Sequence, residues 1–166
     1  MTKIINLFAG PGAGKSTTAA GIFYALKQNG VLIELVTEVA KDLVWSQREQ
    51  CIKCQPLIFG KQLYRIERLI GKVDYVVTDS PFLLSALYGQ ALYPKTFIQA
   101  VVDIFAQFDN YNFFLLRNKP YVEVGRIQNE TEAKGIDWQV QHFLDQNNIA
   151  YSKVGGISEI LAQVGT

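Results

Sequence analysis

The chain has 166 residues, of which 49% are hydrophobic and 19% are charged, and its formal net charge is +1. This composition excludes disorder over most of the chain and is typical of a globular domain. Sixteen Lys and Arg against fifteen Asp and Glu leave no general positive field, which argues against bulk nucleic-acid binding by charge. A local basic site remains compatible with these numbers.

The cellular compartment follows from what the sequence lacks. Cys51 and Cys54 are too few for a disulfide framework. The apolar run 4–9 is interrupted by a Gly-Pro-Gly sequence, so no signal-peptide core forms. No stretch approaches the roughly 18 apolar residues that a membrane span needs. We therefore expect a cytoplasmic protein without membrane contact.

Strand and helix signals alternate along the chain. Runs rich in β-branched and aromatic residues predict five strands, at 3–8, 31–36, 73–78, 111–116 and 150–154. Helical spacing of apolar residues follows the first run until Asn29-Gly30, and it precedes the fourth and fifth runs. A short helix, 157–164, is expected at the end. The alternation predicts an α/β fold, a mostly parallel sheet covered by helices on both faces, within one domain of residues 1–166.

A glycine-rich loop lies between the first strand and the first helix. It fits the Walker A pattern, with Ala9 in place of the first glycine. Its glycines let backbone N–H groups surround a phosphate at the N-terminus of the helix. The alternative is a glycine-rich turn that contains Lys-Ser by chance, but such a turn would not need a strand before it and a helix after it. Lys15 is expected to reach the β- and γ-phosphates of ATP, and Ser16 to bind Mg²⁺. The predicted nucleotide-binding residues are Gly10, Pro11, Gly12, Ala13, Gly14, Lys15, Ser16 and Thr17.

The third predicted strand ends in Asp79, at the sheet edge where ligands bind in open α/β folds. Mg²⁺ in a P-loop protein needs an acidic ligand from a neighbouring strand, so Asp79 is predicted to bind metal or to act in catalysis. Ser80-Pro81 follows, which is typical of a helix start, and a capping role for Asp79 is the compatible alternative.

Three classes of P-loop protein compete: small-molecule kinases, GTPase switches, and motor or helicase ATPases. The size of the chain disfavours a motor or helicase. A GTPase reads guanine with Asn-Lys-x-Asp, but residues 118–121 are Asn-Lys-Pro-Tyr and lack the carboxylate. Residues 79–82 also lack the glycine that senses the γ-phosphate. A kinase is therefore favoured.

The chain resembles the P-loop kinase family of nucleoside and nucleotide kinases, including nicotinamide riboside kinase-like domains and small kinases encoded by phages. The resemblance rests on the five strands, the loop 10–17, Glu38 after the second strand, Asp79-Ser80-Pro81, and an arginine-bearing segment after the fourth strand. It implies a three-layer P-loop NTPase fold with strand order 2-3-1-4-5. It also implies an acceptor-binding segment at about 38–72 and a lid at about 117–135.

The lid segment contains Arg117 and Arg126. Phosphoryl transfer depends on positioning and charge neutralisation, so lid arginines that exclude water and contact the γ-phosphate are expected to be catalytic. Glutamates are interleaved with them, which leaves a solvated helix face as the alternative.

A carboxylate is needed near the attacking oxygen of the acceptor, and Glu38 and Asp79 are the candidates. The resemblance assigns Glu38 to acceptor binding or base catalysis. A negative charge that favours the N-terminus of a helix is the alternative for Glu38.

The segment 41–72 carries seven Lys and Arg against three Asp and Glu, a local charge of +4 that predicts an anionic acceptor. Trp45, Gln62 and Arg65 are predicted to bind this acceptor, with an aromatic surface for a base and a hydrogen-bonding amide. The alternative is that the aromatic residues belong to the core and the basic residues to a solvated helix face.

The sequence thus predicts a kinase that uses ATP and Mg²⁺. It moves the γ-phosphate to a hydroxyl or phosphate of a nucleoside, nucleotide or nucleotide-like acceptor. The resemblance to phage kinases adds a 5-hydroxymethyl pyrimidine within DNA as a candidate acceptor. The alternative is a DNA-associated ATPase or regulatory P-loop protein without an acceptor. The oligomeric state stays open.

Overall fold

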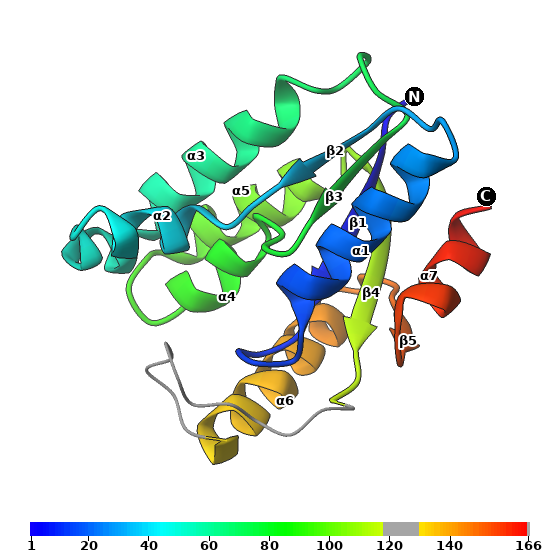
Figure 1. Ribbon diagram of the computed structural model, residues 1–166. Helices are drawn as coiled ribbons and strands as arrows, with labels where there is room; N and C mark the ends of the chain where they lie inside the picture. Colours follow the sequence, from blue (N-terminus) through cyan, green and yellow to red (C-terminus); the bar gives the residue numbers. More distant parts are fainter. Residues whose placement is uncertain (118–129, 166) are drawn as a thin grey trace.

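The computed structural model describes residues 1–117 and 130–165 (Figure 1). Helices and strands alternate along most of the chain, as the sequence predicts. The elements are β1 (Lys3–Phe8), α1 (Lys15–Gln28), β2 (Ile33–Val36), α2 (Val39–Trp45), the 3-10 helix η1 (Glu49–Lys53), α3 (Gln55–Glu67), β3 (Tyr75–Thr78), α4 (Leu84–Gly89), α5 (Lys95–Phe105), β4 (Asp109–Leu115), α6 (Glu130–Gln146), β5 (Ser152–Val154) and α7 (Ile157–Val164).

The five strands form one parallel sheet in the order β2-β3-β1-β4-β5. Ile4 in the central strand β1 pairs with Val76 of β3 and Asn110 of β4. The predicted α/β fold and strand order are confirmed. Because the strands are parallel, β1, β2 and β3 end at the same edge of the sheet, and the loops that follow them meet there.

Alternate residues of β1 serve two hydrophobic cores, one on each face of the sheet. Ile4 and Phe8 pack into the core that α3, α4, α5 and α6 complete. Ile5 and Leu7 pack into the core under α1 and α7. The result is the predicted three-layer arrangement, with the central strand buried on both faces (Figure 1).

The starts of four strands differ from the prediction by two residues. β2, β3 and β5 begin later than predicted, at Ile33, Tyr75 and Ser152, whereas β4 begins earlier, at Asp109 rather than at 111. Asp and Asn disfavour strands, but Asn110 is fixed here by its neighbours. Its side chain accepts a hydrogen bond from Asn6 Nδ2 at 2.9 Å and donates to the carbonyl of Phe105 at 2.7 Å. Pairing with the long central strand therefore overrides local propensity. No helix in the described part of the chain is long and apolar enough to span a membrane.

Candidate active site

The loop between β1 and α1 turns through two glycines with left-handed backbone geometry. Gly12 has φ 77°, and Gly14, the N-cap of α1, has φ 94°. A side chain at either position would be strained, so the sequence requires glycine there. The loop consequently wraps the N-terminus of α1, which is the arrangement that binds phosphate in P-loop proteins.

Lys15 lies at the start of α1 and folds back over this loop. Its Nζ donates to the carbonyl oxygens of Ala9 at 2.7 Å and Gly10 at 3.0 Å. Burial lowers the pKa of Lys15, and the nearby carboxylates of Glu38 and Asp79 act in the opposite direction. The Lys15 side chain is therefore bonded to the phosphate loop, and the charges of Glu38 and Asp79 favour its protonated form.

Asp79 follows β3 directly and is only 5% exposed. Its Oδ2 accepts a hydrogen bond of 2.5 Å from Ser16 Oγ, the first link between the loop and the neighbouring strand. The next helix, α4, begins at Leu84 and its N-cap is Leu83, so Asp79 does not cap it. The capping alternative is thereby removed for α4. Ser16 and Asp79, which are both predicted to bind Mg²⁺, are hydrogen-bonded to each other.

This pair is chemically suited to Mg²⁺. Asp79 Oδ1 is buried and has no hydrogen-bond partner among the described residues. An unpartnered buried carboxylate oxygen is costly, and a cation would satisfy it. No group of three or more His, Cys, Asp and Glu gathers around a metal position in residues 1–117 and 130–165. An ion held by Ser16 and Asp79 would thus take its remaining ligands from nucleotide phosphates and water.

Glu38 occupies the N-cap position of α2 with an extended backbone, but its side chain makes no capping hydrogen bond. Burial raises its pKa, and the positive charge of Lys15 opposes that increase. A carboxylate with a raised pKa is a stronger proton acceptor than an ordinary glutamate. The geometry accordingly leaves the Glu38 side chain available for chemistry.

A cavity of about 260 Å³ brings several of the predicted residues together. It opens between the phosphate loop and α2, beside the exposed indole of Trp45. Trp45 is 78% exposed, so it is not a core residue. We call this the catalytic cavity. Its walls are Ser16, Leu35, Thr37, Glu38, Lys41, Asp42, Trp45 and Asp79.

Gln62 has different partners from those predicted. It is 1% exposed, and its Oε1 accepts a hydrogen bond from the backbone N–H of Val39 at 3.1 Å. Its Nε2 donates to the carbonyl of Thr37 at 3.2 Å. The carboxamide thus joins α3 to the connection between β2 and α2, and Gln62 does not line the catalytic cavity. Its contribution is to position Glu38, which lies between its two bonded residues.

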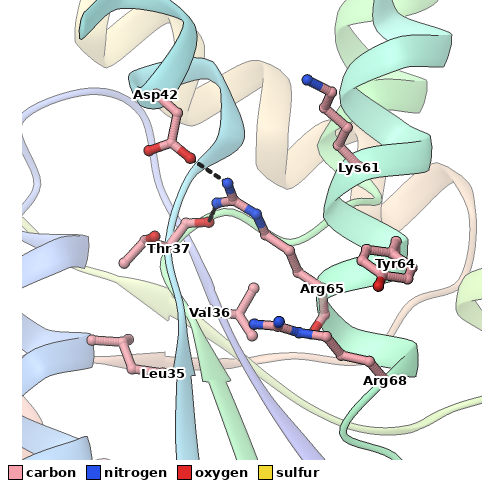
Figure 2. Close-up of a pocket in the computed structure, with 8 residues that line it drawn as sticks. All are labelled: Leu35, Val36, Thr37, Asp42, Lys61, Tyr64, Arg65 and Arg68. Atoms are coloured by element: carbon pink, nitrogen blue, oxygen red, sulfur yellow. Dashed lines mark hydrogen bonds and ion pairs between the residues drawn. The ribbon is translucent and has the colours of Figure 1, made fainter. Parts of the chain in front are cut away.

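Arg65 lies outside the catalytic cavity. Its guanidinium donates to the carbonyl of Thr37 at 3.0 Å and forms an ion pair with Asp42. These bonds hold Arg65 in a second, adjoining cavity on the outer side of β2 (Figure 2). The predicted acceptor-binding residues are therefore divided among a cavity wall, the core and a second cavity.

Arg117 is connected to the phosphate loop by Asp137 of α6, which contacts both. It forms an ion pair with Asp137 and donates to the carbonyl of Ala133 at 3.2 Å. The other oxygen of Asp137 accepts a 2.6 Å hydrogen bond from the backbone N–H of Gly10. Residues 130–135 of the predicted lid form the start of α6. Arg126 lies outside the described residues.

Sequence patterns did not single out Asp137 or Tyr88. Asp137 sits within an amphipathic helix, and only the packing of α6 against Gly10 gives it a role at the loop. Tyr88 lies on the short helix α4. Tyr88 is 44% exposed; desolvation of its hydroxyl raises the pKa of Tyr88 to about 12, and the charges of Glu38 and Asp137 add to the increase. Neither residue belongs to a local motif, so no sequence signal identifies them.

A family model described as an AAA domain matches residues 4–159. The chain belongs to this family. Two solved structures of deoxyadenosine kinase from M. mycoides are similar in fold. The first, with bound dATP, has a TM-score of 0.59 and 16% identity and covers 100% of both chains. The second, with the products dCMP and a flexible dCDP, has a TM-score of 0.53 and 15% identity over 99% of this chain and 96% of the other.

The family match and the shared fold confirm the P-loop kinase-like resemblance that the sequence predicts. At these identities the similarity to the two kinase structures concerns the fold alone. No protein of curated function matches the chain.

Proposed function

We propose that the protein is a Mg²⁺-dependent phosphotransferase. It moves the γ-phosphate of ATP to a hydroxyl or phosphate of a nucleoside, nucleotide or nucleotide-like acceptor. The observation that carries the proposal is the catalytic cavity. There Ser16 of the phosphate loop, Asp79 at the end of β3 and Glu38 after β2 line one space next to Lys15.

On the nucleotide side, the loop 10–17 and the N-terminus of α1 bind the phosphates of ATP. Lys15 exchanges its bonds to the Ala9 and Gly10 carbonyls for bonds to the phosphate oxygens. Ser16 and Asp79 would hold Mg²⁺, which would neutralise negative charge on the phosphates when bound. Arg117, released from Asp137, and Arg126 of the lid segment add positive charge at the transferred group.

On the acceptor side, Glu38 is the better candidate for the general base. Asp79 is bonded to Ser16 and committed to the metal, whereas the Glu38 side chain makes no capping bond and has a raised pKa. The acceptor oxygen forms a bond to the γ-phosphorus while the bond to the bridging β–γ oxygen breaks. ADP leaves with that electron pair, and the hydroxyl proton passes to the Glu38 carboxylate.

The acceptor is held by the segment 38–72, with the indole of Trp45 stacked on its base. The fold similarity to deoxyadenosine kinase favours a nucleoside or nucleotide over an unrelated small molecule. A 5-hydroxymethyl pyrimidine in DNA belongs to the same chemical class, because its hydroxyl is carried by a nucleotide base.

An acceptor panel tests this function. The protein is incubated with γ-labelled ATP, Mg²⁺ and nucleosides, mononucleotides, unmodified DNA or DNA containing 5-hydroxymethyluracil. We expect label in one acceptor class, with none when Mg²⁺ is removed by chelation. Hydrolysis of ATP without label in any acceptor would favour an ATPase or regulatory protein instead.

A further inference from the structure

A second cavity, of about 480 Å³, lies on the outer side of β2, at the edge of the sheet (Figure 2). We call it the edge cavity. One wall is the end of the edge strand, from Leu35 to Thr37. The other wall is α3 together with its C-cap residue Arg68, and the side chains that line it follow at helical spacings of three and four, namely Lys61, Tyr64, Arg65 and Arg68.

The sequence of α3 explains why these four side chains share a wall. The opposite face of the helix is buried and holds Ile58, Gln62 and Ile66. Lys61, Tyr64 and Arg68 are therefore left on the exposed face, and Arg65 is partly buried between the two faces. A single helix thus presents three cations and an aromatic ring to one cavity.

The cations of the edge cavity are not equivalent. Arg65 is fixed by the carbonyl of Thr37 and by Asp42, the one acidic residue in the cavity wall. Lys61 and Arg68 form no ion pair with any carboxylate in the described parts of the chain. Two positive charges therefore remain uncompensated beside a fixed arginine, and an anion would neutralise them.

The two cavities adjoin. Leu35, Thr37 and Asp42 line both of them, so the edge cavity continues from the wall of the catalytic cavity. The charge changes across this shared wall. Glu38 and Asp79 lie on the catalytic side together with one cation, Lys41, whereas three cations, Lys61, Arg65 and Arg68, lie on the other. A ligand whose neutral hydroxyl faces the carboxylates and whose phosphate faces the cations would match both sides.

We propose that the edge cavity is a phosphate subsite for the acceptor, so that the protein selects phosphate-bearing acceptors over free nucleosides. This inference rests on the proposed phosphotransferase function and specifies its acceptor. Lys61 and Arg68 contact the phosphate, Arg65 shapes the cavity floor, and Tyr64, which is 66% exposed, offers a ring to an adjacent base. The phosphate belongs either to a mononucleotide or to the backbone of an oligonucleotide.

Equilibrium binding tests the subsite. The phosphate loop is first saturated with a non-hydrolysable ATP analogue, so that the probes cannot occupy it. Thymidine, thymidine 5′-monophosphate and a short single-stranded oligodeoxynucleotide are then titrated into the wild type and into the Lys61→Gln/Arg68→Gln double variant. Arg65 is left intact because it also holds Thr37 and Asp42. The matched control is Lys95→Gln/Lys153→Gln, which removes the same charge from the exposed surfaces of α5 and β5.

We expect the phosphate-bearing probe to bind the Lys61→Gln/Arg68→Gln variant about tenfold more weakly, and the salt dependence of its affinity to fall. Thymidine affinity and ATP-analogue affinity stay unchanged, and the control variant binds like the wild type. Loss for the mononucleotide assigns the subsite to the acceptor's own phosphate. Loss for the oligonucleotide alone assigns it to a neighbouring backbone phosphate. Unchanged affinity for both phosphate-bearing probes would overturn the proposal.

The same proteins are assayed with γ-labelled ATP, which separates the two proposals. A binding loss in the double variant together with no phosphoryl transfer in the wild type would refute the kinase function and leave the anion site standing. Transfer that is equal in the wild type and the double variant for every phosphate-bearing acceptor would refute the subsite and leave the kinase function standing.

Discussion

The nucleotide side and the acceptor side of the catalytic cavity are built in different ways. The nucleotide side uses one continuous loop, whose left-handed glycines aim the backbone at the N-terminus of α1. Ser16 and Asp79 on this side are bonded to each other at 2.5 Å, and Lys15 is bonded to the loop carbonyls. The acceptor side uses side chains from β2 and α2 and continues into the edge cavity, where α3 contributes further side chains, and most of the charges of the two cavities on this side are positive.

Under the proposed function, this difference assigns phosphoryl transfer to the nucleotide side and the choice of acceptor to the acceptor side. Backbone geometry at the loop is fixed by glycines and by the buried sheet, so the nucleotide side tolerates little change. Exposed residues such as Trp45, Lys61 and Arg68 are replaceable without repacking the core. Substitutions on the two sides should therefore differ in kind: one set affects transfer to every acceptor, and the other affects the choice of acceptor.

The largest effect is expected for Lys15→Ala on the nucleotide side. The change removes the ammonium group beside the phosphate loop, and phosphoryl transfer should fall by about a thousandfold for every acceptor. The measurement is the initial rate with γ-labelled ATP, together with ATP affinity by calorimetry. The control is Lys27→Ala on the same helix, whose exposed pair with Glu34 contributes little. Equal rates for the wild type and Lys15→Ala would refute the nucleotide-side assignment.

Glu38→Gln acts where the two sides meet, and kcat should fall about a hundredfold or more because the proton acceptor is lost. In the wild type, activity should be lost as the pH falls through the Glu38 pKa, which lies above the ordinary 4.5, since only the ionised carboxylate takes a proton. The variant should lack this acidic limb. The control, Glu34→Gln on β2, should keep both the rate and the pH profile. An unchanged profile in Glu38→Gln would exclude Glu38 as the base.

Asp137→Ala tests the support behind the nucleotide side. It leaves the Gly10 N–H without its acceptor and Arg117 without its ion-pair partner. The free energy of unfolding should fall by about 1–3 kcal/mol, measured by urea denaturation. Asp137→Asn keeps an oxygen for Gly10 and should lose less. Asp103→Ala, on the exposed side of α5, should stay near the wild type, and a loss equal to that of Asp137→Ala would contradict the assignment.

Trp45→Ala should give the smallest effect, confined to the acceptor side. The side chain is 78% exposed, so stability should not change, while the KM for the acceptor should rise about fivefold to tenfold through lost stacking. The KM for ATP should stay constant. Trp138→Ala, an exposed tryptophan on α6, is the control. A rise in the KM for ATP but not for the acceptor would reverse the assignment of the two sides.

The sequence predicts the position of the glycine-rich loop and of Asp79 well because the information for both is local. The loop 9–17 is a continuous motif, and Asp79 is marked by the end of an apolar run. β1 and α7 have the predicted boundaries because apolar periodicity and turn residues agree there. Parallel topology then brings Asp79 next to Ser16 without any further signal.

The acceptor side is predicted less well because its contacts are long-range. The amide of Gln62 could bind a substrate, but in the folded chain its Oε1 accepts a hydrogen bond from the backbone N–H of Val39. Arg65 is recognisably basic, yet only the folded position of α3 puts it in the edge cavity rather than in the catalytic cavity. Asp137 and Gly10 are hydrogen-bonded although they are 127 positions apart in the sequence, and the apolar periodicity of a helix does not predict such a contact.

The most direct test of the central claim is the stoichiometry of a single turnover. The protein in excess over γ-labelled ATP is mixed with Mg²⁺ and the best acceptor of the panel, and ADP, inorganic phosphate and phosphorylated acceptor are quantified over time. We expect the phosphorylated acceptor to form mole for mole with ADP, with negligible inorganic phosphate. Release of all the label as inorganic phosphate, at the same rate with and without the acceptor, would contradict a phosphotransferase.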